Sequence, residues 1–161
     1  MKRNLLAVAL SFVAGPAVAL SCLPVSVADS YREAAAAEET YIVVHGRLEF
    51  DTSRLPKVDL DAQDQTPPQT DIPARLSGKF LSKDGFQGDF DRAITVRALC
   101  FGPWCGQPVS GADYLAFLEE TPKGYFLSSS PCGGFDFAKP TPDMLRTVTQ
   151  CMQGGVCQSE R

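Results

Sequence analysis

The sequence predicts a mainly β domain that closes into a small barrel or sandwich, with one helix before the strands and one after them. A hairpin is the clearest observation. Tyr114 to Leu118 is an unbroken apolar run, Thr121 to Gly124 supplies turn residues, and Tyr125 to Leu127 begins a return run of strand formers. Continuous apolar runs are typical of strands buried on both faces. The cysteines on either side of the hairpin, Cys105 and Cys132, add the expectation of disulfide bonds.

The N-terminus has the pattern of a secretory signal peptide. The first four residues carry two positive charges, Leu5 to Gly15 is apolar and uncharged, and Ala17 to Ala19 is a small-residue cleavage site. We therefore expect residues 1–19 to be removed and a periplasmic or secreted protein to begin at Leu20. Acylation of Cys22 is the alternative, but the leucine expected three residues before a lipidated cysteine is missing.

Composition narrows the classes of partner. Loss of the signal would remove Lys2 and Arg3, which leaves 13 basic and 19 acidic residues and a net charge of −6. Such a chain is a poor ligand for nucleic acid or anionic lipid, and no later stretch is apolar for long enough to span a membrane. All six cysteines follow the signal, so a disulfide framework is expected, although six cysteines allow 15 pairings.

The first elements after the signal are a helix and a strand. Ser26 and Asp29 have the spacing of a capping box, and the strong helix formers after them predict a helix over Val27 to Glu38. Thr40 to Phe50 is β-branched and aromatic, which predicts a central or strongly curved strand. Gly46 within it indicates a bulge or a close approach of another backbone.

An acidic, proline-rich loop is expected over residues 51–73. Asp59, Asp61 and Asp64 invite comparison with a calcium loop, but an EF-type loop needs glycine at its sixth position and glutamate at its twelfth, where this chain has Asp64 and Thr70. A solvated loop is the better interpretation. Two more strands are expected at Ala74 to Ser82 and Arg92 to Leu99, the second alternating between apolar and polar residues.

A second helix is expected near the C-terminus. Thr141 is a good N-cap, Pro142 suits the first helical position, and the helical segment Met144 to Met152 ends before two glycines at 154–155. A local bond between Cys151 and Cys157 would tie down the tail that follows.

We expect no catalytic residues, cofactor or metal. His45 is the only histidine and lies in an apolar strand, so it is interpreted as a partly buried strand residue. Trp104 and Cys105 superficially resemble a thioredoxin motif, but Pro108 occupies the position of the second thiol. The chain also lacks a nucleophile elbow, a phosphate loop and a dinucleotide fingerprint.

Several short motifs together carry a family resemblance. They are Ser21 to Pro24, the strand Tyr41 to Leu48, Cys105-Gly106, Gly111 to Phe117 and Cys132 to Gly134. In this order they resemble the netrin-like domain of tissue inhibitors of metalloproteinases, in its bacterial secreted form. The resemblance implies a five-stranded OB-fold-like barrel over residues 20–138, followed by the C-terminal helix and disulfide-bonded tail over 139–161.

The resemblance also implies the disulfide pairing. Family members often begin with two cysteines separated by one residue, and here only the second is present, as Cys22, with Leu20 in place of the first. Cys22 would then pair with Cys132, and Cys105, left without its usual partner, with Cys100. Cleavage after Ala19 would leave two residues before Cys22, so we do not expect its amine to chelate a protease zinc as in the animal inhibitors.

For function, the resemblance predicts an exported, non-enzymatic protein-binding module, with an exported protease as the candidate partner. The contact surface in the related inhibitors joins the N-terminal segment to the loop at the equivalent of Cys105. We call its counterpart here the ridge, which comprises Leu20, Ser21, Leu23, Pro24, Phe101, Pro103 and Trp104. Two alternatives remain open: the aromatic residues fold back onto the core, or the protein is a structural, envelope-associated one that contacts its partner through the acidic loop or tail.

Overall fold

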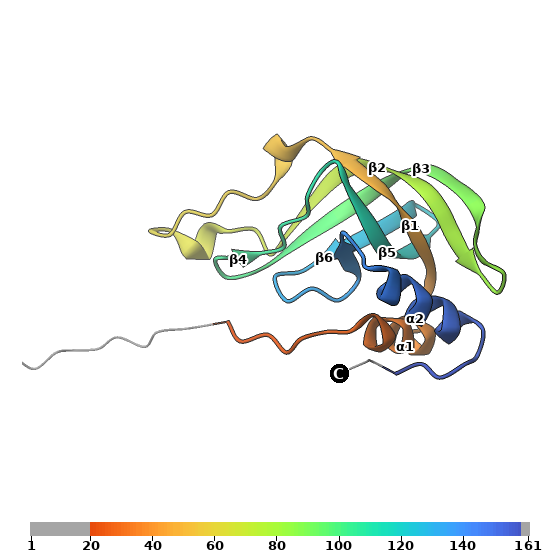
Figure 1. Ribbon diagram of the computed structural model, residues 1–161. Coiled ribbons are helices and arrows are strands. Elements are labelled where there is room, and N and C mark those ends of the chain that lie inside the picture. The colour runs from red at the N-terminus through yellow and green to blue at the C-terminus, as the bar shows by residue number, and fades with distance from the viewer. Residues whose placement is uncertain (1–19, 159–161) are drawn as a thin grey trace, which may run out of the picture.

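The computed structural model describes residues 20–158, so the predicted signal peptide lies outside the described residues (Figure 1). The described chain is mainly β, with two α-helices and three disulfide bonds. The helices are α1 (Val27–Ala36) and α2 (Pro142–Met152). The strands are β1 (Thr40–Phe50), β2 (Gln69–Ser82), β3 (Gly85–Phe101), β4 (Trp104–Cys105), β5 (Ala112–Thr121), β6 (Gly124–Ser129) and β7 (Asp136–Ala138).

The strand pairings form a closed ring. Neighbouring strands follow the order β1–β2–β3–β6–β5, and β1 pairs with β5 as well as with β2. All of these pairings are antiparallel except β3 with β6. Two short strands are added to the ring, β4 on the end of β3 and β7 on β5.

Strand β5 explains why the hairpin sequence is apolar without interruption. Its residues Tyr114, Ala116 and Leu118 belong to the cluster of buried side chains shared by the ring strands. Leu115 and Phe117, on the opposite face, belong to a second cluster that includes residues of both helices. Both faces are therefore buried, as the sequence predicted.

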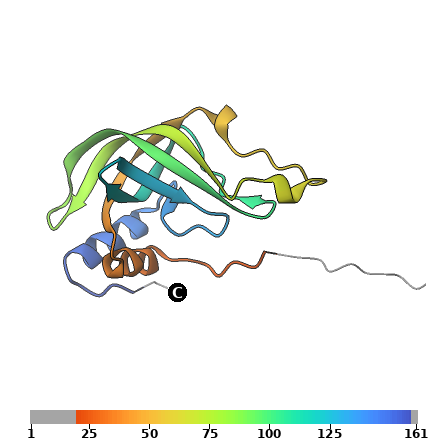
Figure 2. The ribbon, with the colours of Figure 1, turned by 180° about the vertical axis from the view of Figure 1, so that it is seen from behind.

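The two helices lie together on one side of the sheet (Figures 1 and 2). The predicted capping box is present, because Ser26 Oγ accepts the Asp29 N–H and an Asp29 carboxylate oxygen accepts the Ser26 N–H. The helix ends at Ala36 and not at the predicted Glu38, because the backbone becomes extended at Ala37 before Thr40 pairs with Glu120. Thr141 caps α2 as expected.

The acidic loop is shorter than the predicted range of 51–73. Strand β2 already begins at Gln69 and contains Pro73. The part of β2 before Ala74 pairs with β3 but not with β1. A strand that has only one neighbouring strand tolerates the missing N–H of a proline, so Pro73 can lie here.

The strand predicted over Arg92 to Leu99 is also longer than expected. It runs through Gly88, where an added Cβ would lie 1.9 Å from a Phe80 ring carbon.

Gly46 is a close-approach position and lies opposite Gly78. A Cβ on Gly46 would lie 2.4 Å from the Ser77 carbonyl oxygen.

Candidate protein-binding surface

The N-terminal segment is fixed by the longest disulfide bond. Cys22 is bonded to Cys132, with their Cα atoms 5.2 Å apart and 110 positions between them in sequence. Cys132 lies in the loop between β6 and β7, residues 130–135, which we call the Cys132 loop. This loop also contacts α1, because the buried Ser30 hydroxyl donates a hydrogen bond to the Gly134 carbonyl. The segment before α1 is thus bonded to the end of the strand ring.

The predicted aromatic loop is a disulfide-closed hairpin. Cys100 and Cys105 are bonded and also paired across β3 and β4, as are Phe101 and Trp104. The turn between them includes Gly102 at a φ of +60°, a conformation that glycine adopts without strain. The Cys22–Cys132 and Cys100–Cys105 bonds are the two that the family resemblance implied, and the local bond expected between Cys151 and Cys157 is also present.

A tight backbone contact joins Gly106, directly after the hairpin, to the end of β6, which leads into the Cys132 loop. Gly106 follows the hairpin directly and packs against the end of β6, where a Cβ on Gly106 would lie 2.1 Å from the Ser129 carbonyl oxygen. The Cys132 loop starts immediately after Ser129. In both ribbon views the N-terminal segment, this loop and the β3–β4 hairpin lie at the same end of the strand ring (Figures 1 and 2).

Most ridge residues are accessible to solvent. Leu23 is 85% exposed and Phe101 is 48% exposed, which are high values for large apolar side chains. Ser21 and Pro24 are exposed, whereas Leu20, Pro103 and Trp104 are half-buried. Neither apolar cluster of the described core includes Phe101 or Trp104.

A half-buried carboxylate lies beside the Cys132 loop. Asp136 is the first residue of β7. Burial raises its pKa to about 6, although a hydrogen bond with the Ser129 hydroxyl lowers the pKa in part. Burial raises the pKa of Tyr114, and the negative charge of Asp136 raises it further. Because the pKa of Asp136 lies above its ordinary value of 3.8, the folded protein holds this proton more tightly than the unfolded chain does. This group's stabilising contribution is complete below about pH 4 and is lost as the pH rises through about 6.

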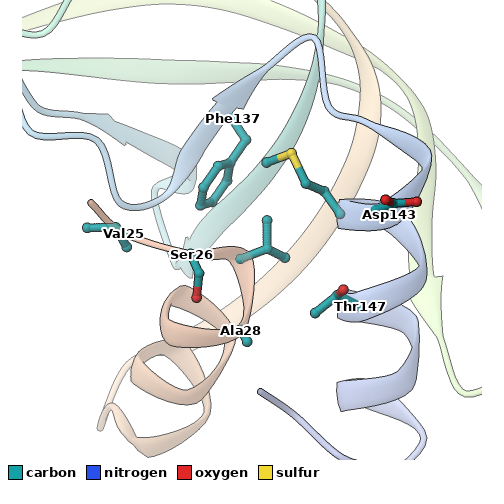
Figure 3. A pocket seen from close by; sticks show the side chains of 8 residues that line it. Val25, Ser26, Ala28, Phe137, Asp143 and Thr147 are labelled. Atoms are coloured by element: carbon teal, nitrogen blue, oxygen red, sulfur yellow. The ribbon is translucent and has the colours of Figure 1, made fainter. Parts of the chain in front are cut away.

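A separate pocket of about 350 Å³ lies between the helices and β7 (Figure 3). Its lining is mainly apolar and includes Val25, Phe137 and Met144, with Asp143 and Thr147 contributed by α2. Sequence reasoning missed this pocket because its residues come from two parts of the chain that are distant in sequence, 25–28 and 137–147. Asp143 is already paired with Arg146.

An ion pair on the outside of the ring was also missed. Arg97 of β3 donates to Glu119 of β5 at 2.7 Å, and its guanidinium lies 3.8 Å from the centre of the Phe126 ring. Both charged side chains are largely buried, at 25% and 20% exposed. The alternation of apolar and polar residues in β3 predicted that Arg97 lies on the outer face of the sheet. It did not predict the contact with the Phe126 ring.

Other predicted features are distributed across the fold. His45 is half-buried and packs edge-on against Phe86, with ring centres 5.8 Å apart. Over residues 20–158, His, Cys, Asp and Glu side chains form no group of three or more that could hold a metal ion. The helices of that same range are too short or too polar to cross a bilayer.

Comparison of the chain with protein-family models, with curated proteins and with solved structures gave no significant match.

Proposed function

We propose that this chain is an exported OB-fold-like domain of the netrin-like type that binds another protein without catalysing a reaction. The closed order of five strands with one parallel pairing supports the barrel assignment, since an OB-fold is a five-stranded Greek-key barrel. The signal-peptide pattern and the three disulfide bonds support export to an oxidising compartment.

One observation carries the proposal of protein binding. Two disulfide bonds and the Gly106–Ser129 contact hold two separate segments at one end of the molecule, and each segment exposes a large apolar side chain there, Leu23 and Phe101. Apolar side chains on a rigid support lose little conformational entropy when they bind, which is why interfaces use them as anchors. Inhibition of an exported protease is the activity that the family resemblance adds to this proposal.

The test is a binding comparison between two matched variants. Phe101→Ala should weaken capture of the partner from the exported proteins of the source cell by at least tenfold, because hot-spot aromatics account for most interface energy. Phe80→Ala is the control, since Phe80 is 38% exposed and lies near the tip of the β2–β3 hairpin. Both variants should keep the wild-type circular dichroism spectrum.

Equal capture by the Phe101→Ala variant and the wild type would contradict the proposal. A partner that is lost after changes in the acidic loop, but not after changes at Phe101 or Leu23, would instead favour the structural, envelope-associated alternative.

A further inference from the structure

The end of the molecule that carries the ridge contains no charged side chain in its three contributing segments. Residues 20–25, 99–111 and 130–135 include no Asp, Glu, Lys or Arg, although 21% of the whole chain is charged. Depletion of charge is what distinguishes the centre of a protein interface from the rest of a surface. The uncharged area is therefore larger than the ridge and includes the Cys132 loop.

The acidic loop borders this uncharged end on one side. Its last residue, Pro68, accepts a hydrogen bond from the Cys100 N–H at 2.9 Å, so the loop returns directly beside the β3–β4 hairpin. In both ribbon views the loop extends toward the same end as the N-terminal segment (Figures 1 and 2).

The loop combines exposed carboxylates with an exposed apolar side chain. Asp59, Asp61 and Asp64 are all exposed, and Leu60, between the first two, is 71% exposed. Of the basic residues in the loop, Arg54 is paired with Asp51. Four acidic and two basic residues over 51–68 give this border a net charge of −2.

We infer that the ridge and the acidic loop form one docking surface, for a protein partner with an apolar centre and a basic rim. This inference rests on the proposed function, because it assigns a chemistry to the partner of the same ridge. The uncharged end and Leu60 would bury the partner's apolar residues, and Asp59, Asp61 and Asp64 would face its lysines or arginines. An acidic partner would place like charges opposite the loop, which disfavours its association.

The probes are two short peptides with the same central Leu-Trp-Leu, one with lysines and the other with glutamates on both sides. Binding is followed by amide chemical shifts of the ¹⁵N-labelled exported protein at low ionic strength. We expect the lysine peptide to shift amides of residues 20–24, 59–64 and 101–104, with a Kd about tenfold below that of the glutamate peptide. The difference should largely disappear in about 0.5 M NaCl, where the Debye length falls to about 4 Å.

Two charge variants locate the preference. Asp59→Asn/Asp61→Asn/Asp64→Asn should remove the tenfold preference and leave weak binding of both peptides at the ridge. Glu33→Gln/Glu38→Gln/Glu39→Gln makes the same change in net charge at exposed positions of α1 and the segment after it, and should leave the preference intact.

Two other kinds of result would contradict the inference or the proposed function. Equal Kd values for the two peptides, or a preference that both triple variants reduce alike, would overturn the inference and leave the ridge as a binding surface. Absence of shifts at residues 20–24 and 101–104 with either peptide would overturn the proposed function together with the inference.

Discussion

Removal of the Cys22–Cys132 bond should cost far more stability than removal of either short disulfide. The bond closes a loop of 110 positions, for which loop-closure entropy in the unfolded chain corresponds to about 4.8 kcal/mol at 25 °C. The bonds with separations of 5 and 6 correspond to about 2 kcal/mol each. With an unfolding entropy of about 2.1 cal/mol/K per residue, the long bond is expected to raise the Tm by about 15 °C and a short one by about 7 °C.

The assay is thermal and urea unfolding of Cys22→Ser/Cys132→Ser beside Cys151→Ser/Cys157→Ser. The second variant is the matched control, because it also removes two cysteines but closes a loop only about one-twentieth as long. Equal losses of Tm in the two double variants would refute the reasoning from loop closure. The long-bond variant should also lose binding at the ridge, since Leu23 is then attached to α1 alone.

Three further substitutions test local features. Asp136→Asn should raise the free energy of unfolding by up to about 3 kcal/mol above pH 6 and change it little near pH 4, because it removes the cost of burying an ionised carboxylate. Urea unfolding at pH 4, 6 and 8 measures this difference. An equal gain at every pH would contradict the raised pKa of Asp136. Gly106→Ala should cost about 1–3 kcal/mol, since its Cβ would overlap the Ser129 carbonyl, and an unchanged Tm would contradict the tight contact. Ser26→Ala should cost about 1 kcal/mol through loss of the capping box of α1, and a Tm shift no larger than that of Ser128→Ala, a half-buried serine in β6, would count against it.

The parts of the fold that depend on local sequence could be predicted. The capping box at Ser26 and the proline at position 142 fixed where the helices begin, since capping is a property of neighbouring residues. The continuous apolar run of β5 indicated burial on both faces, which the two separate apolar clusters explain.

The parts that depend on contacts between distant residues could not be predicted. Pro73 suggested a loop, yet it lies in a strand because β1 is absent on one side of it, which is a fact about strand register and not about proline itself. Strand β7 is too short to produce a periodic pattern and exists because Asp136 and its neighbours add to β5. The exposure of Phe101 and Leu23 likewise depends on where the disulfide bonds hold their segments.

The most direct test of protein binding at the ridge is site-specific photocrosslinking in the exported protein. A benzophenone amino acid would replace Leu23 or Phe101 in turn, with Phe80 as the control position on the β2–β3 hairpin. Positions 23 and 101 should both form an adduct of the same mass with one partner protein, and position 80 should not. An adduct formed at position 80 alone, or no adduct at either ridge position, would contradict binding at the ridge.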